Sequence, residues 1–410
     1  MPKIQLAVVF GSRSCEHDVS VISALQCMEA ADKDLYDIIP VYISRDGAWY
    51  TGAALRELAT FQDFQPDTPG VLRVYPDVTA GSGALMTILR KKGLFSGDAL
   101  SVAARIDAAL LVLHGTNGED GSVQGLLELM NVPYTSSGLL GSAVGMDKIA
   151  MRQLFRGYGF PTLDAHWFSR DEWESDADAV IAQSEQKLAY PMFVKPANLG
   201  SSIGISKVHD AASLREGIAV ALSYDRRVLV ERGIEKPVEV NCSVLGFGAD
   251  IRASVCEMPV SWQEFLTFDE KYLRGGKTVK EERKSPGSME SLSRQIPAPI
   301  GEEKTERIQA LSRDIFRALD CCGVVRIDYM IEGDIIYVGE INTIPGSLAF
   351  YLWEPDDVPF SVLLDQLIAF AYTAHAEKNR AVFAFDSDVL HNTLAGSKGV
   401  KRRLGGKGPL

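Results

Sequence analysis

The 410-residue sequence has few cysteines, no long apolar segment and no excess of positive charge. Its six cysteines form no CxxC pair and lack a histidine at the spacing of a zinc site, so we expect free thiols in a reducing cytoplasm. Because no apolar run reaches the roughly 18 residues that span a bilayer, we expect no membrane partner. A formal charge of −12 argues against a nucleic-acid partner. The N-terminal stretch MPKIQLAVVFG has no cleavage region, which predicts no signal peptide.

The order of apolar patterns indicates an α/β protein of two or three domains, at about 150 residues per domain. Up to about residue 140, short apolar runs alternate with helix-like stretches, which is typical of a parallel α/β layer. Strands are expected at residues 6–10, 38–43, 108–113, 192–195, 205–208 and 228–231. Helices are expected around residues 122–130, 147–158 and 361–375.

Two segments lack such a pattern. Residues 268–294 are charged and contain glycine, serine and proline, so we expect a mobile loop that serves as a lid or binding element. The tail from Asn392 is basic and rich in glycine, and we expect it to be partly flexible.

A hairpin with one polar face is expected in VVRIDYMIEGDIIYVGEINTIPG, residues 324–346. Two β-branched-rich runs, 324–331 and 335–342, are joined by a three-residue loop, Glu332-Gly333-Asp334. Because side chains alternate faces along a strand, this loop places four polar residues on one face, with Arg326 opposite Glu340. The four are Arg326, Asp328, Glu340 and Asn342.

Two carboxylates and an amide oxygen suit a hard cation such as Mg²⁺, and a guanidinium suits phosphate or a developing oxyanion. The hairpin therefore predicts a magnesium site with an adjacent arginine. An exposed hairpin with salt bridges is the alternative.

The segment MFVKPANLGSSIGISKV, residues 192–208, predicts a strand, a glycine/serine turn and a second strand. Such a turn lets backbone N–H groups and the hydroxyls of Ser201 and Ser202 converge on phosphate oxygens, with Lys195 as a point charge. The GxxxxGK[ST] order of a Walker A loop is missing, and an ordinary hairpin is the alternative.

Six motifs occur in order: FGSRSCEHDVS at 10–20, HGTNGEDGSVQG at 114–125, MDK at 146–148, VKPANLGSSIG at 194–204, FDEKY at 268–272 and RIDYM…GEINTIPG at 326–346. From about residue 4 to 375 the sequence thereby resembles the D-alanine–D-alanine ligases of the ATP-grasp superfamily. The resemblance implies a three-domain α/β ATP-grasp fold. Its parts would be a parallel α/β first-substrate domain at 1–140, a central domain at 141–230, a C-terminal domain at 231–375 that includes the loop 268–294, and an extension at 376–410.

The resemblance also implies an ATP site between the central and C-terminal domains. Lys148 and Lys195 match the nucleotide-contacting lysines, and Ser202 matches the group that closes over the phosphates. Glu231 matches the residue that receives the adenine amino group. Glu239 matches the ribose-contacting carboxylate, although its spacing from Glu231 is one residue longer than in the family. The ligands of Mg²⁺ or Mn²⁺ would be Asp328, Glu340 and Asn342.

In the implied reaction, ATP converts a carboxylate to an acyl phosphate, and the amine of a second amino acid attacks it. Arg326 and the backbone N–H of Gly346 match the oxyanion-stabilising groups. Glu16 matches the residue that binds the first ammonium group, and it would be linked through Ser201 to Tyr272 of the loop.

Three further positions bear on the substrates. His114, at the head of its motif, is expected to line the site. The Lys271-Tyr272 pair favours an amine over a hydroxyl nucleophile. After ExNTxPG, the family serine that binds the second substrate's carboxylate is replaced by Tyr351. Its phenol would donate the same hydrogen bond, the pocket would be reshaped for another acceptor, or the side chain would only pack.

The resemblance therefore implies a cytoplasmic ligase that joins D-alanine to D-alanine for peptidoglycan precursors, with a homodimer as a family-level expectation. A sister ligase that uses D-serine, D-lactate or another amino acid as acceptor is the first alternative. A non-catalytic nucleotide-binding relative is the second, and the retained charged motifs argue against it.

Overall fold

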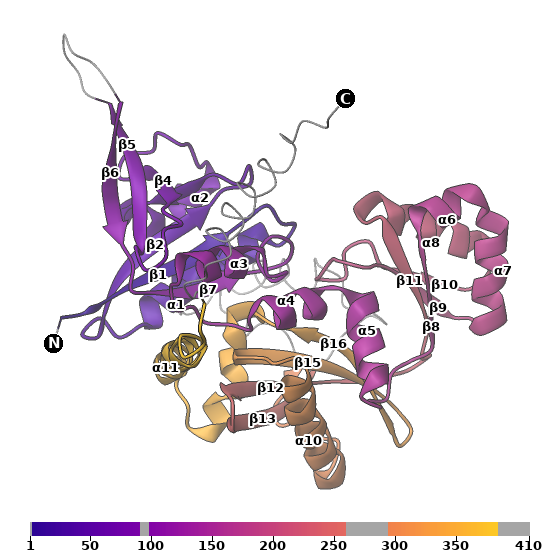
Figure 1. Ribbon diagram of the computed structural model, residues 1–410. Coiled ribbons are helices and arrows are strands. Elements are labelled where there is room, and N and C mark those ends of the chain that lie inside the picture. Colours follow the sequence, from indigo (N-terminus) through magenta and orange to yellow (C-terminus); the bar gives the residue numbers. More distant parts are fainter. Residues whose placement is uncertain (1, 91–97, 260–293, 384–410) are drawn as a thin grey trace, which may run out of the picture. The chain divides into compact units, whose positions relative to one another are not determined.

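The computed structural model describes residues 2–90, 98–259 and 294–383 (Figure 1). The chain divides into two compact units, Met1–His375 and Ala376–Leu410. The described strands of the first unit form three separate β-sheets. Within the described ranges, no helix has the length and apolar character needed to cross a bilayer.

The first sheet has seven strands in the order β6-β5-β4-β3-β2-β1-β7. Its strands are β1 (Ile4–Gly11), β2 (Tyr36–Ile43), β3 (Trp49–Thr51), β4 (Leu72–Pro76), β5 (Ala84–Arg90), β6 (Asp98–Arg105) and β7 (Ala108–Leu113). Only the pairs β1–β2 and β1–β7 are parallel, so the expectation of a parallel layer is correct for these strands and wrong for β3 to β6, which pair antiparallel. Residues 44–48, which join β2 to β3, and residues 77–83, which join β4 to β5, are too few for the crossover connection that parallel pairing needs.

The burial of the strands follows this division. Every residue of β7 is buried, as expected for a parallel strand covered on both faces, whereas β6 is half-exposed. The accompanying helices are α1 (His17–Ala30), η1 (Ala53–Arg56), α2 (Ala59–Gln62), α3 (Ser122–Met130) and α4 (Leu139–Met146). The predicted helix at 122–130 is confirmed, and it ends at Asn131, whose φ of 52° is left-handed.

The second sheet is antiparallel, in the order β10-β9-β11-β8. Its strands are β8 (Ala165–Ser169), β9 (Met192–Pro196), β10 (Ser206–Val208) and β11 (Arg227–Arg232). The helices in this part of the chain are α5 (Lys148–Gly157), α6 (Arg170–Ser175), α7 (Ala177–Lys187) and α8 (Ala211–Tyr224). Leu214 and Ile218 of α8 pack on Val194 of β9 and Val230 of β11, so α6 to α8 cover one face and leave Lys195 for the other (Figure 1).

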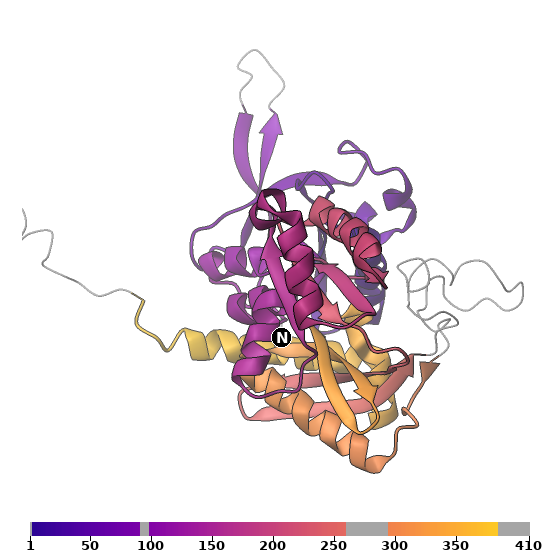
Figure 2. The same cartoon turned by 90° about the vertical axis from the view of Figure 1, so that its right-hand side faces the viewer.

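The third sheet is antiparallel, in the order β14-β13-β12-β15-β16. Its strands are β12 (Val238–Phe247), β13 (Asp250–Pro259), β14 (Arg294–Gln295), β15 (Gly323–Glu332) and β16 (Ile335–Asn342). The amphipathic helix α10 (Glu302–Ala318) lies along one face of it, where Ile308 and Ile315 meet Val240 and Ile327 (Figures 1 and 2). The elements η4 (Gly346–Leu352), η5 (Glu354–Asp356) and α11 (Phe360–Lys378) follow β16.

The two strands of the hairpin β15–β16 place polar side chains on one face, as predicted, but the strands pair in a different register. Its loop has two residues, Gly333 and Asp334, because Glu332 pairs with Ile335. A bulge between Asp328 and Tyr329 then shifts the pairing. The prediction of Arg326 opposite Glu340 is therefore wrong. The pairs are Arg326 with Asn342 and Asp328 with Glu340.

Gly339 is the extra residue of this bulge. A Cβ atom there would lie 2.9 Å from the backbone oxygen of Asp328, so the close approach of the two strands requires glycine. The bulge brings the carboxylates of Asp328 and Glu340 directly opposite each other.

Candidate functional site

A cavity of about 200 Å³ collects most of the predicted site residues. Those that line it are Glu16, His114, Lys148, Lys195, Ser201, Ser202, Glu239, Arg326, Asp328, Glu340, Asn342, Gly346 and Tyr351. Glu231 lies directly behind the lining, where it contacts Lys195. The predicted residues Lys271 and Tyr272 lie outside the described residues. The segments that form this site come from all three sheets.

Glu16 and the serine turn meet in the cavity. Glu16 precedes α1, and its Oε1 accepts a short hydrogen bond from the Ser201 hydroxyl, which is the link expected between them. Ser201 and Ser202 both have positive φ, at 52° and 60°. A Cβ atom at Gly200 would lie 2.7 Å from Oε2 of Glu16, so a larger residue there would displace the Glu16 carboxylate.

The polar face of the hairpin holds two ion pairs. Arg326 donates to both carboxylate oxygens of Asp328, from Nε at 2.7 Å and from Nη2 at 2.9 Å. Lys148 Nζ lies 3.4 Å from Oε2 of Glu340. Asn342 donates from Nδ2 to Asp328 at 3.2 Å. Each carboxylate therefore has a cationic partner and stands beside the other carboxylate.

The oxygen atoms of these side chains suit a small divalent cation that also contacts phosphates. Mg²⁺ is commonly held by one or two carboxylates together with substrate oxygens, and Asp328 and Glu340 supply two. In the described part of the chain, no group of three or more His, Cys, Asp or Glu side chains is arranged so that it could hold a metal ion.

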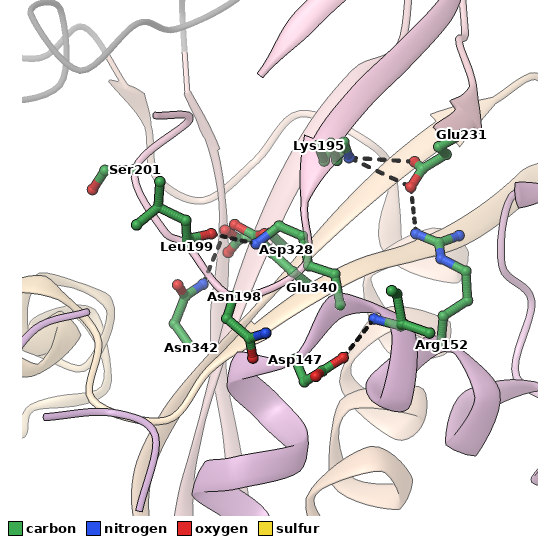
Figure 3. A network of polar contacts seen from close by, with 12 residues as sticks. Asp147, Arg152, Lys195, Asn198, Leu199, Ser201, Glu231, Asp328, Glu340 and Asn342 are labelled. Atoms are coloured by element: carbon green, nitrogen blue, oxygen red, sulfur yellow. Dashed lines mark hydrogen bonds and ion pairs between the residues drawn. The ribbon is translucent and has the colours of Figure 1, made fainter. Parts of the chain in front are cut away.

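The two lysines come from different elements. Lys148 opens α5, whose N-cap Asp147 accepts from the N–H groups of Ile149 and Ala150. It is buried and donates from Nζ to the carbonyl of Leu199 at 2.6 Å, beside the serine turn. Lys195 projects from β9 toward Glu231, at 3.4 Å (Figure 3).

Glu231 has a second cationic partner that the sequence reasoning missed. Arg152 Nη2 lies 2.5 Å from Oε2 of Glu231, and Nη1 donates to the carbonyl of Leu163 (Figure 3). Glu231 is 1% exposed. Burial raises its pKa, but the charges of Arg152 and Lys195 outweigh burial and lower it. The spacing of Lys148 and Arg152, four residues apart on a predicted helix, was the available signal.

His114 lies in the lining, but both ring nitrogens are engaged. Nδ1 is 2.9 Å from the carbonyl of Ile344, and Nε2 is 3.1 Å from Oγ of Ser23. Burial lowers the pKa of His114 to about 4, so the ring is neutral at physiological pH. His114 therefore joins the loop after β7 to the chain after β16.

Glu119 is a further lining residue that was not singled out, although it belongs to the GEDG motif. Its carboxylate accepts from the N–H groups of Gly115 at 2.8 Å and Ile344 at 3.2 Å. Burial, together with the nearby Glu16, raises the pKa of Glu119 to about 8. The carboxylate thus links the same two segments that His114 joins.

Tyr351 makes two contacts within the cavity lining. Its hydroxyl donates to Oε1 of Glu257 at 3.0 Å, and the guanidinium carbon of Arg294 lies 4.1 Å from its ring centroid. The preceding residues Ser347, Leu348 and Ala349 all have φ near 50°, which turns the chain after Gly346. Glu257 and Arg294 are lining residues that no motif had indicated.

The six cysteines are all free, as predicted. Cys15 is exposed, next to Glu16, and the other five are buried.

Comparison with known proteins gives the family. The model of the D-ala D-ala ligase N-terminus matches residues 5–137, and that of the D-ala D-ala ligase C-terminus matches residues 154–369. A D-alanine–D-alanine ligase of Thermosipho africanus is 36% identical over 94% of this chain and 98% of its own. One from Natranaerobius thermophilus is 37% identical over 93% and 98%.

Two solved structures agree. The D-alanine–D-alanine ligase of Coxiella burnetii is 26% identical, with a TM-score of 0.75 over 98% of this chain and all of its own. The VanG D-Ala:D-Ser ligase of Enterococcus faecalis is 28% identical, with a TM-score of 0.74 over 90% of this chain and all of its own. Because the family models and the relatives span most of its length, the chain belongs to the D-alanine–D-alanine ligase family and has the ATP-grasp fold.

Proposed function

We propose that this protein is an ATP-dependent ligase that joins D-alanine to D-alanine for peptidoglycan precursors. The observation that carries the proposal is the cavity in which Glu16, Lys148, Lys195, Arg326 and the hairpin carboxylates converge, in a chain related throughout to D-alanine–D-alanine ligases. Its substrates are small molecules.

The proposed nucleotide side comprises Lys148, Lys195, Ser202, Glu231 and Glu239. Lys148 and Lys195 would offset the charges of the phosphates, and Glu231, which is itself paired with Arg152, holds Lys195 in place. Asp328, Glu340 and Asn342 would hold Mg²⁺ or Mn²⁺, which, when bound, neutralises the transferring phosphoryl group. The opposed carboxylates support this assignment.

The proposed substrate side comprises Glu16, Ser201, Arg326 and Gly346. Glu16, oriented by Ser201, would bind the ammonium group of the first D-alanine. Arg326 and the N–H of Gly346 would stabilise the tetrahedral oxyanion that forms when the second amine attacks. Tyr272 and Lys271 of the loop would complete the site and exclude water.

A different acceptor is the second candidate. The cavity wall around Asn241, Glu257 and Tyr351 is polar, and such a wall suits a side chain with a hydroxyl group, as in D-serine. The D-Ala:D-Ser ligase of Enterococcus faecalis, a structure similar to this chain, is named for such an acceptor. D-lactate and other amino acids are further candidates.

An acceptor panel tests both. Purified protein is given ATP, Mg²⁺, D-alanine and, in turn, D-serine, D-lactate or another amino acid, and the product is identified by mass spectrometry with ADP release. We expect D-alanyl-D-alanine from D-alanine alone. No product with D-alanine, but product with another acceptor, would favour the second candidate.

We also propose domain boundaries near residues 140 and 230, a homodimer and a cytoplasmic location. The separate cores of the second and third sheets support the boundary near 230, and the six free cysteines suit a reducing compartment. Light scattering on the purified protein tests the dimer.

A further inference from the structure

One wall of the cavity carries a charged group of side chains, which we call the acceptor wall. It consists of Asn241 on β12, Glu257 on β13, Arg294 on β14 and Tyr351 in η4. Oε1 of Glu257 accepts from Asn241 at 2.9 Å and from Tyr351 at 3.0 Å, and Oε2 lies 3.4 Å from Arg294. Glu257 is 3% exposed, and so buried a carboxylate needs these partners.

The Tyr351 hydroxyl is committed to this group. A phenol has one O–H donor, and that donor points at Glu257, so it is not directed at a substrate carboxylate. The Tyr351 ring instead supports the guanidinium of Arg294 by a cation–π contact at 4.1 Å. Tyr351 and Glu257 together fix the orientation of Arg294.

The other lysine and arginine side chains of the described cavity lining are paired with carboxylates of the proposed nucleotide and metal positions. Lys148 lies beside Glu340, Lys195 beside Glu231, and Arg326 forms two hydrogen bonds with Asp328. Among the described residues that line the cavity, Arg294 is the arginine on the acceptor wall.

The acceptor wall is close to the proposed reaction centre. Strand β12 joins the two, because Asn241 pairs with Glu257 of β13 on one side and with Asp328 of β15, the partner of Arg326, on the other. In an α-amino acid the amine and the carboxylate are attached to the same carbon atom. An acceptor whose amine reacts beside Arg326 therefore holds its carboxylate near this wall.

We infer that Arg294, stacked on Tyr351 and oriented by Glu257, binds the carboxylate of the second amino acid in place of the serine hydroxyl. A guanidinium has five N–H donors in a planar fork, so it can hold Glu257 and a substrate carboxylate together. Arg294 is thus a binding residue, and Glu257 and Tyr351 are positioning residues. The inference rests on the proposed ligase function.

Steady-state kinetics of Arg294→Gln, with ADP release as the readout, test it. We expect the KM for the second D-alanine to rise about 10- to 100-fold, because a charge-assisted hydrogen-bonded pair is lost. The KM values for ATP and the first D-alanine should change less than about twofold. D-alaninamide, which lacks the carboxylate, should be a far poorer acceptor than D-alanine for the wild type. It should be nearly equal to D-alanine for Arg294→Gln.

Three variants serve as comparison. Arg294→Lys keeps the charge without the fork and should give an intermediate rise in the second KM. Tyr351→Phe keeps the ring, and its second KM should rise less than that of Arg294→Gln. Arg252→Gln, on the same strand as Glu257 but exposed and bonded to Gln366, should match the wild type.

An unchanged second KM in both Arg294 variants, with an active wild type, would overturn the inference alone. A larger rise in Tyr351→Phe than in Arg294→Gln would also overturn it, because the phenol would then be the carboxylate donor. A wild type that forms no product from any D-amino acid would overturn the proposed function, and the inference with it.

Discussion

At the scale of single residues, the site depends on buried charged side chains that are paired with side chains of opposite charge. Arg152, Glu231 and Lys195 form one such group, with the carboxylate between two cations. Removal of one cation from such a group leaves the buried carboxylate only partly balanced.

Arg152→Ala is expected to destabilise the fold by about 3–5 kcal/mol, because Glu231 then keeps only the more distant Lys195. ATP binding should weaken as well, since Lys195 and Glu231 lose their fixed geometry. Urea unfolding and calorimetric titration with ATP measure the two effects. Arg156→Ala, in which an exposed pair with Asp164 is lost, is the matched control and should change stability by less than about 1 kcal/mol. Equal losses in the two variants would contradict the role of Arg152.

Glu119 gives the unbound protein a specific pH dependence. Its folded pKa of about 8 lies above the ordinary glutamate value of 4.5, so the folded state favours the protonated form. This contribution to stability is complete below about pH 4.5 and is lost as the pH rises toward 8.

Glu119→Gln mimics the protonated form at every pH. The free energy of unfolding of the variant, minus that of the wild type, should therefore increase between pH 5 and 9, as followed by urea unfolding at several pH values. A difference that is flat over this range would show that Glu119 is ionised throughout.

At the scale of elements, the bulge in β16 places Glu340 opposite Asp328, the two carboxylates proposed to hold the metal ion. Gly339→Ala places a Cβ atom 2.9 Å from the Asp328 backbone oxygen, so the strands must separate or the bulge must move. We expect a loss of about 1–3 kcal/mol in stability and weaker Mg²⁺ dependence of activity, because Glu340 no longer lies opposite Asp328. Gly333→Asn is the control, since Gly333 has φ 62° with open space around it and asparagine tolerates that conformation. A Gly339→Ala enzyme with unaltered Mg²⁺ dependence would refute this role.

The same hairpin shows what sequence can predict. Alternation along a strand placed Arg326, Asp328, Glu340 and Asn342 on one face, and it did so despite a wrong loop length and register. The bulge at Gly339 was not predictable, because it depends on the approach of a second backbone. The strands β3 to β6 were missed because they are short or half-exposed and lack a continuous apolar run. Glu257, Arg294 and Tyr351 meet only through the pairing of β13 with β14 and the turn at Ser347, which local pattern does not encode.

At the scale of the whole molecule, the C-terminal chain returns to the first sheet. Leu363, Leu364 and Leu367 of α11 share a core with Val9 of β1 and Leu111 of β7. Trp353 belongs to that core and donates to Ser243 of β12, in the third sheet. The first sheet is therefore completed by residues more than 200 positions away in sequence, which argues against independent folding of residues 1–140.

Leu364→Ala should cost about 2–5 kcal/mol, the usual range for a fully buried leucine. Hydrogen exchange should then increase in β1 and β7 as well as in α11, because they share one core. Val362→Ala, at an exposed position of the same helix, is the control and should leave exchange in the first sheet unchanged. Faster exchange confined to α11 would contradict the shared core.

The distribution of thiols has a practical consequence. Cys15 is exposed beside Glu16, while the other five cysteines are buried. A maleimide fluorophore should therefore attach to the folded protein at a single position, without any engineered cysteine. Such a label would sit one residue from the proposed ammonium-binding carboxylate, where it can report occupancy of the first D-alanine position in real time.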